Sequence, residues 1–135
     1  MVFLAVSTGL RISELLGLKW VDIDFEALEI RLTRSVVDQV VGDMKTERKP
    51  IPLDSGLAEV LLNWRLRSAY NQPEDWLFAS PTKKGSQPYS PDTILSKVLR
   101  PAVKRAGIGK RVGWHTFRHY AEFWNMPNDR AMAAA

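Results

Sequence analysis

The sequence predicts an α+β domain that is mostly helical and carries a small antiparallel sheet. Apolar residues recur at helical spacing in several segments, and β-rich runs separated by turn residues occupy the region between 28 and 53. The 135 residues fit one domain, since domains span roughly 100–200 residues. We expect this domain to occupy residues 1–124, and residues 125–135 to form a disordered tail.

The N-terminal part is predicted to be helical. Residues 1–7 are apolar and no capping residue precedes them, so the chain is expected to begin inside a helix. Thr8-Gly9 breaks this helix, and we expect the Thr8 hydroxyl to cap a second helix whose apolar face begins at Ile12. Asp22–Glu26 follows as a predicted turn.

Three β-rich segments come next. Leu28–Thr33 alternates apolar and polar residues, which is typical of a strand with one buried face. Val36–Val41 is a second run with Gly42-Asp43 as its turn, and Lys45–Leu53 supplies the returning strand. The prolines of this last strand lack the N–H that a central strand donates, so we expect it at the edge of the sheet.

Ser55–Ala69 is predicted to form a helix, because apolar residues recur there at positions i, i+3, i+4 and i+7. Its buried face is expected to consist of Leu57, Val60, Leu61 and Trp64. Beyond it, Trp76–Phe78 is predicted to be a short buried anchor. Ser80–Tyr89, which is rich in Pro, Gly, Ser and Lys, is predicted to be a loop.

Two further helices are predicted. Ser90-Pro91 marks the start of the first, and Pro101 is expected to kink it. The apolar stripe of this helix consists of Ile94, Leu95, Val98, Leu99, Ala102, Val103 and Ala106. The second is Trp114–Trp124. Its faces consist of the apolar residues Phe117, Tyr120, Ala121 and Trp124 and the polar residues His115, Arg118, His119 and Glu122.

Positive charge is concentrated in one part of the chain. Residues 1–78 carry nine Lys or Arg against twelve Asp or Glu, whereas residues 79–119 carry nine against the single acid Asp92. Such a block focuses positive potential towards a polyanion, although a solvated lysine-rich surface has the same composition. The candidate nucleic-acid-binding residues are Lys83, Lys84, Lys97, Arg100, Lys104, Lys110 and Arg111.

The sequence excludes several classes of site. It has no cysteine, so disulfides, Cys zinc sites and thiol nucleophiles are ruled out. His115 and His119 have metal-ligand spacing, but Thr116 stands where a zinc protease has Glu, and we predict no metal. Neither a Gly-x-Ser-x-Gly elbow nor a Gly-rich phosphate loop occurs. We recognise no signal peptide or membrane span and expect a cytoplasmic protein.

Four dispersed cationic side chains remain as candidates for chemistry: Arg11, Lys45, His115 and Arg118. Two guanidiniums can hold a phosphodiester through a pentacoordinate transition state, while a lysine or histidine protonates the leaving alkoxide. Spacing alone leaves plainer alternatives open. Arg11 could pair only with Glu14, and Lys45 could be a solvated turn residue. His115 could simply cap a helix.

Three strings resemble the motifs of one family. Thr8–Trp20 (TGLRISELLGLKW) resembles the first arginine box of the tyrosine recombinases, the phage integrase family. His115–His119 (HTFRH) resembles its H-x-x-R-H box, and Lys45-Thr46 before Arg48–Leu53 (RKPIPL) resembles its β-hairpin lysine segment. The two boxes stand in the family's order, and the resemblance covers residues 1–119.

The resemblance implies a tyrosine-recombinase (DNA breaking-rejoining) catalytic domain that clamps duplex DNA. Such enzymes cut one strand with a tyrosine, leaving a 3′-phosphotyrosyl link and a free 5′-hydroxyl, then rejoin it to a new partner without metal or nucleotide cofactor. By motif, Arg11 and Arg118 would hold the scissile phosphate and His115 would assist proton transfer. Lys45, or its competitor Lys49, would protonate the leaving 5′-oxygen. The protein would then work at the nucleoid.

The sequence departs from the family pattern at its ends. The residues after Arg118 do not resemble the segment that carries the nucleophilic tyrosine. Tyr120 falls on the apolar helix face and is expected in the core, while Tyr70 and Tyr89 precede the box. We also expect the DNA-binding arm domain that precedes the family's catalytic domain to be missing. We therefore expect a fragment that lacks its C-terminal helices; the alternatives are a non-enzymatic module that co-assembles with an intact recombinase, and a relic without a ligand.

The 135-residue chain alone is predicted to form no covalent adduct with DNA, because it has no tyrosine at the nucleophile's position. A nicked suicide duplex, incubated with the protein and resolved on a denaturing gel, measures this. An intact recombinase of the family is the positive control. A DNA-linked band with this chain would contradict the prediction.

Self-association or domain swapping is also predicted. Without further helices, apolar surface around Phe117, Tyr120 and Trp124 is expected to be exposed, and such surface favours contact between copies. Light scattering of the purified chain should give a mass above that of one copy. A monomeric mass over the whole concentration range would disprove it.

Overall fold

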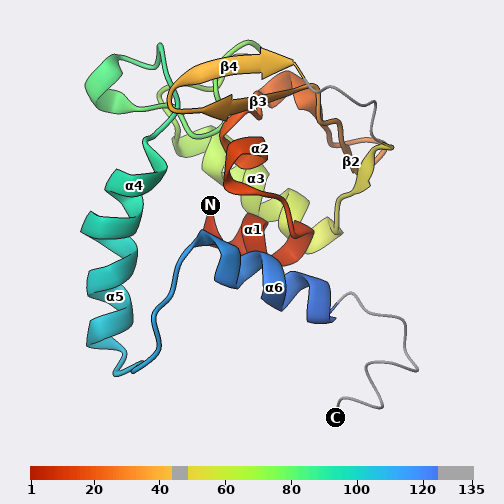
Figure 1. Ribbon diagram of the computed structural model, residues 1–135. Coiled ribbons are helices and arrows are strands. Elements are labelled where there is room, and N and C mark those ends of the chain that lie inside the picture. The colour runs from red at the N-terminus through yellow and green to blue at the C-terminus, as the bar shows by residue number, and fades with distance from the viewer. Residues whose placement is uncertain (44–48, 125–135) are drawn as a thin grey trace. The chain divides into compact units, whose positions relative to one another are not determined.

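The computed structural model describes residues 1–43 and 49–124, and the side chains of 1–43 and 49–120. The expected tail at 125–135 lies outside the described residues, as does Lys45. The chain divides into two compact units, Met1–Arg11 with Asp92–Ala135, and Ile12–Pro91. Figure 1 shows the elements of both units, and the mostly helical α+β class is confirmed.

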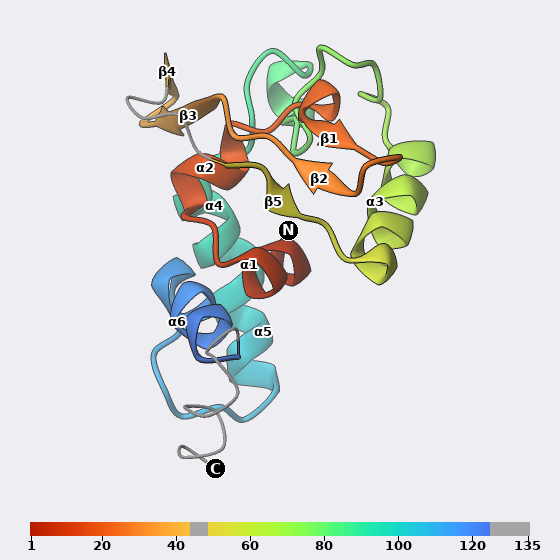
Figure 2. The ribbon, with the colours of Figure 1, turned by 90° about the vertical axis from the view of Figure 1, so that its right-hand side faces the viewer.

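The unit Ile12–Pro91 contains a three-stranded antiparallel sheet (Figure 2). Its strands, in the order β1-β2-β5, are β1 (Ile23–Asp24), β2 (Glu29–Ile30) and β5 (Ile51–Pro52). The edge position of the proline-containing strand is confirmed. The strand predicted over 28–33 is reduced to two residues, because Leu28 has φ of 55° and still belongs to the preceding turn.

The turn predicted at Asp22–Glu26 begins later in the structure. A 3-10 turn, η1 (Trp20–Asp22), leads directly into β1, and the chain reverses only after Asp24. The Asp24 carboxylate accepts hydrogen bonds from the backbone N–H of Glu26 (3.0 Å) and of Ala27 (2.9 Å). This Asx turn is what connects β1 to β2.

A separate hairpin replaces the second predicted β-run. It pairs β3 (Arg34–Val37) with β4 (Val40–Asp43) through a two-residue turn at Asp38-Gln39. The prediction of one strand over Val36–Val41 with a turn at Gly42-Asp43 is therefore wrong. Asp38 and Gln39 both adopt positive φ (50° and 64°), as a type I′ hairpin turn requires, and Gly42 pairs with Ser35 inside the ladder.

Helix α3 (Ser55–Arg67) confirms the predicted helix but not all of its buried face. The Asp54 carboxylate caps it by accepting from the N–H groups of the first turn. The buried residues are Leu57, Ala58 and Leu61. Val60 and Trp64 are 49% and 42% exposed, because the packed face is centred one position away from the predicted one. The Trp64 indole N–H instead donates to the carbonyl of Leu77 at 3.2 Å.

The anchor Trp76–Phe78 is buried, as predicted. The Leu77 N–H donates to the Leu18 carbonyl at 2.9 Å, next to the end of helix α2 (Ile12–Leu16). The Lys19 ammonium lies 4.5 Å from the centroid of the Trp76 ring, a cation–π contact. The loop that follows contains only a short 3-10 turn, η2 (Pro81–Lys83).

The other unit is built from helices. They are α1 (Val2–Thr8), α4 (Pro91–Ile94), the π-helical η3 (Leu95–Leu99), α5 (Arg100–Arg105) and α6 (Trp114–Trp124). The bounds predicted for α6 are confirmed. Helix α1 buries Leu4 and Ala5 and contacts α6. In Figure 1, α4 and α5 run together as one continuous helical rod.

A π-helical stretch, η3, stands immediately before α5, the helix that contains Pro101. Proline has no N–H, and its ring would collide with the carbonyl four residues earlier, that of Lys97. A wider π turn immediately before α5 accommodates both effects within a continuous helix. The extra residue rotates the predicted stripe, so Val98 and Ala106 are exposed.

Thr8 does not cap the second helix, which corrects the prediction. It is the last residue of α1, and its hydroxyl donates to the Leu4 carbonyl (2.7 Å) and accepts from the Leu10 N–H (3.3 Å). Gly9, at φ of 69°, ends the helix in the left-handed conformation that glycine adopts without strain.

Gly17→Ala should destabilise the fold. A Cβ atom on Gly17 would collide with the carbonyl oxygen of Arg34, and overpacking of this kind costs about 1–3 kcal/mol. Gly42→Ala is the matched control, because nothing lies within 4 Å of its added Cβ. Urea unfolding followed by tryptophan fluorescence measures both, and equal midpoints for the two variants would contradict the expectation.

Candidate functional site

Helix α6 carries two of the predicted catalytic residues and begins with a tight cap. The Gly113 N–H donates to the Thr116 hydroxyl (3.0 Å), and the Thr116 N–H donates to the Gly113 carbonyl (3.1 Å). The Thr116 side chain thus takes the part that Glu or Gln plays in a capping box. It fixes the first turn, where His115 is exposed. This role of Thr116 was not predicted, although the sequence has the threonine three residues after a glycine.

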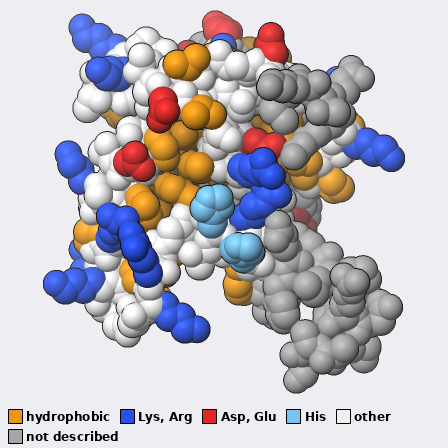
Figure 3. Space-filling model, in the orientation of Figure 1, with side chains coloured by type: hydrophobic (Ala, Val, Ile, Leu, Met, Phe, Trp, Pro, Cys, Tyr) orange, Lys and Arg blue, Asp and Glu red, His pale blue; other side chains and the backbone are white. Residues whose placement is uncertain are grey.

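The two predicted faces of α6 are only partly borne out by the described side chains. His115, Arg118 and His119 share a face by their spacing, and both histidines lie at the surface (Figure 3). Arg118 is half-buried. On the other side, Trp114 and Phe117 pack edge to face, with ring centroids 5.9 Å apart and an interplanar angle of 62°. Both rings are half-buried, like Arg118, whereas the two histidines are exposed.

Arg11 belongs to the same compact unit as His115 and Arg118, although they come from opposite ends of the sequence. After α1 ends at Gly9, Leu10 is buried and Arg11 is exposed. Helix α1 contacts α6, which links the segment before Arg11 to the helix that carries the other two residues. Three of the four predicted catalytic positions therefore fall in one unit.

Only one of the two candidate hairpin lysines belongs to the described residues. Lys45 lies at 44–48, outside the described residues, while its competitor Lys49 is exposed just before β5. Glu14, which the sequence offered as a partner for Arg11, is buried in α2.

The prediction that Tyr120 lies in the core is wrong, since its side chain is 51% exposed. At about 100° per residue, Tyr120 lies about 60° around the helix from Phe117 but about 120° from Trp114, at the edge of the side that the two rings define. Phe117 is half-buried. The side chain of Trp124, which was also assigned to the apolar face, lies outside the described side chains.

All seven candidate nucleic-acid-binding residues are exposed. Lys83 and Lys84 belong to the loop of the unit Ile12–Pro91, and the other five belong to the helical unit. Lys and Arg side chains gather over the α5 region in Figure 3. Four of the seven surround a depression of about 200 Å³ that is lined by Arg100, Val103, Lys104, Ile108, Lys110, Arg111 and Val112.

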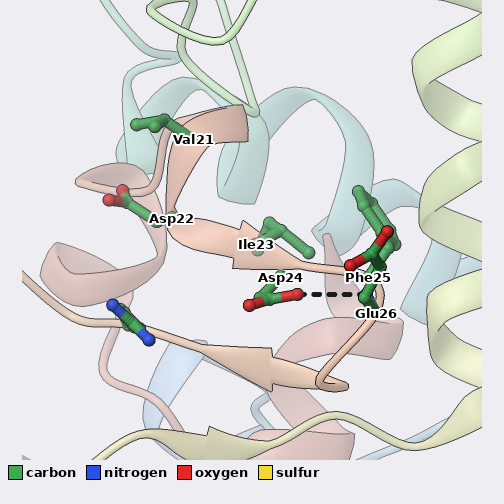
Figure 4. Close-up of a pocket in the computed structure, with 7 residues that line it drawn as sticks. Val21, Asp22, Ile23, Asp24, Phe25 and Glu26 are labelled. Atoms are coloured by element: carbon green, nitrogen blue, oxygen red, sulfur yellow. Dashed lines mark hydrogen bonds between the residues drawn. The ribbon is translucent and has the colours of Figure 1, made fainter.

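A second hollow, of about 390 Å³, lies beside β1 (Figure 4). It is lined by Val21, Asp22, Ile23, Asp24, Phe25, Glu26 and Arg31. Three carboxylates against one guanidinium make it unsuited to a polyanion. Figure 4 shows the Asp24 carboxylate engaged with the backbone of Glu26, so this acid serves the turn.

Within the described residues, no three or more His, Cys, Asp or Glu side chains come together as a metal site would require. The helices of that same part of the chain are all too short or too polar to cross a bilayer.

Two curated proteins illustrate the sequence relationships of the chain. A tyrosine recombinase of Pseudothermotoga lettingae is 35% identical over 119 residues, covering 88% of this chain and 36% of that protein. The tyrosine recombinase XerA of Pyrococcus furiosus is 32% identical over 120 residues, covering 87% and 37%. The chain thus spans little more than a third of the length of these relatives.

Solved structures share the fold. The Tn1549 transposon integrase in complex with circular intermediate DNA matches with a TM-score of 0.75 and 21% identity, over 97% of this chain and 48% of that one. The crystal structure of XerA recombinase matches with a TM-score of 0.64 and 23% identity, over 94% and 43%. The sequence profile of the phage integrase family matches residues 1–128. Since that match covers nearly the whole chain and includes both arginine boxes, the chain belongs to the phage integrase family.

Proposed function

We propose that this chain is part of the catalytic domain of a site-specific DNA recombinase, which cuts and rejoins duplex DNA through a 3′-phosphotyrosyl intermediate. The observation that carries the proposal is that Arg11, His115 and Arg118, which match the family's boxes, belong to one compact unit. The Tn1549 integrase to which the fold is similar is described in complex with DNA. The nucleoid would be the place of action.

The proposed roles follow from the chemistry of a phosphodiester. Guanidiniums bind phosphate oxygens in a bidentate manner and remain charged at any physiological pH, so Arg11 and Arg118 would hold the phosphate as negative charge builds on it. When a tyrosine oxygen attacks phosphorus, the P–O5′ bond breaks and the leaving oxygen needs a proton. Lys45 would donate that proton, and His115 would assist its transfer.

Binding to duplex DNA is expected to depend steeply on salt. If the basic residues engage about six phosphates, log K falls with log salt with a slope near −5. Fluorescence anisotropy with a labelled duplex across a salt series measures this slope. Absence of binding at low salt would refute the proposal for this chain.

Arg11→Ala and Arg118→Ala separate a phosphate site from a merely basic surface. Each variant should lower the magnitude of the slope by about 1, because one phosphate contact is lost. Arg67→Ala, which removes an exposed charge at the end of α3, is the control and should leave the slope unchanged. Equal behaviour of all three variants would remove the two arginines from the proposed site.

A further inference from the structure

Thr116 stands in the first turn of α6, between two residues that match the family's H-x-x-R-H box. His115 precedes it and Arg118 follows two residues later. The Thr116 side chain is exposed, so it contributes little to packing. Threonine is also a weak helix former, because its branched side chain loses rotamer freedom in a helix. Neither packing nor helix propensity therefore explains a threonine at this position.

The Thr116 hydroxyl closes the first turn of the helix. Its oxygen accepts a hydrogen bond from the Gly113 N–H at 3.0 Å, and the Thr116 N–H donates to the Gly113 carbonyl at 3.1 Å. Gly113 has no side chain that could cap α6, and the wide conformational range of glycine leaves the start of a helix poorly defined. The two bonds supply this definition and make Trp114 the first residue of the helix.

The start of α6 decides where His115 lies relative to Arg118. In a helix, residues three apart are separated by about 60° around the axis and by about 4.5 Å along it. His115 is the second residue of α6 and belongs to the turn that frays when a cap is lost, whereas Arg118 belongs to the next turn. Loss of the Thr116 hydroxyl is therefore expected to move His115 and to leave Arg118 in place.

The rest of α6 is held by other contacts. Trp114 and Phe117 pack edge to face with ring centroids 5.9 Å apart, and helix α1 contacts α6. Neither of these contacts involves the Thr116 hydroxyl. The helix should therefore stay folded when the hydroxyl alone is removed, which allows the effect on His115 to be measured separately.

We propose that Thr116 is a positioning residue. Through its bond with the Gly113 N–H, it keeps His115 in helical register with Arg118, so that both side chains reach the same phosphate of the DNA. The inference rests on the proposed function and adds to it a residue that acts through His115. The relative position of two cationic groups thus depends on one hydroxyl.

Two threonines at the same place in two helices give a matched test. Thr116 is the third residue of α6 and Thr93 the third residue of α4, and both are exposed. Unlike Thr116, Thr93 uses only its carbonyl in a side-chain hydrogen bond with the described residues. Thr116→Val should weaken binding to a labelled duplex about fivefold, the cost of a lost cap, whereas Thr93→Val should not change it.

Two more variants separate the hydrogen bond from helix propensity. Thr116→Ser keeps the hydroxyl and should bind like the unaltered chain. Thr116→Ala lacks the hydroxyl but is a better helix former, so it should stay folded and still bind as weakly as Thr116→Val. Thermal unfolding shows which variants are folded, and the alanine variant decides the question if the valine variant is not.

NMR distinguishes positioning from a general loss of stability. On titration of the unaltered chain with the duplex, the ring signals of His115 and the Nε–H signal of Arg118 should both shift. In Thr116→Ala, the shift of His115 should be largely lost while Arg118 keeps its own. The ring of His119, one turn further along α6, is the internal reference and should behave alike in both proteins. Thr116→Ser should restore the shift of His115.

The outcomes separate this inference from the proposed function. If the unaltered chain binds duplex DNA without a shift of His115, or if Thr116→Val behaves like Thr93→Val, Thr116 does not position His115 and the proposed function stands. The same holds if Thr116→Ala binds like the unaltered chain, or if His115, Arg118 and His119 lose their shifts together. If the unaltered chain does not bind duplex DNA at all, both proposals fail.

Discussion

Arg34 holds three segments of the unit Ile12–Pro91 together. Its guanidinium donates to the Asp22 carboxylate at 2.5 Å and to the Gly17 carbonyl at 3.0 Å. The same carboxylate accepts from the Lys19 N–H (2.9 Å) and the Thr33 hydroxyl (3.4 Å). Because the Asp22 side chain is only 5% exposed, these donors are what offset the cost of burying its charge. The end of α2, η1 and the start of β3 thus meet at one ion pair.

The backbone at Gly17 also lies close to the backbone at Arg34. Gly17 lies directly against the Arg34 carbonyl, where a side chain could not be accommodated. Arg34 is the first residue of the hairpin and pairs with Asp43, the last residue of β4. The position of Arg34 therefore sets the position of Asp43 and of the end of β4. In the sequence, Lys45, the proposed general acid, follows two residues later. The hairpin turn at Asp38-Gln39 completes the ladder from the other end.

How much of the fold could be predicted from the sequence depends on how many residues each hydrophobic or turn pattern spans. Helix α6 was predicted with its observed bounds because eleven residues carry a continuous amphipathic pattern. A two-residue strand is too short to show the alternation of apolar and polar residues. For that reason β1 was not predicted, and β2 was predicted to be longer than it is. The hairpin was misread because Asp38-Gln39 turns without glycine, while Gly42, the conventional turn residue, lies in the ladder. The π turn before Pro101 is one of several ways in which a helix can accommodate a residue without an N–H, and the sequence pattern does not show which one is used.

The roles of charged residues could likewise be predicted only in part from the sequence. Arg11, His115 and Arg118 were predicted because the family's motifs fix their spacing, but what an arginine does in a fold depends on the groups that surround it. Arg34 was passed over, and it is neutralised by Asp22 inside the fold. Arg100 has the same side chain and lies at a hollow with no lining carboxylate. A count of basic residues treats these two arginines alike, whereas the potential that a polyanion meets depends on the charge left uncompensated at each place.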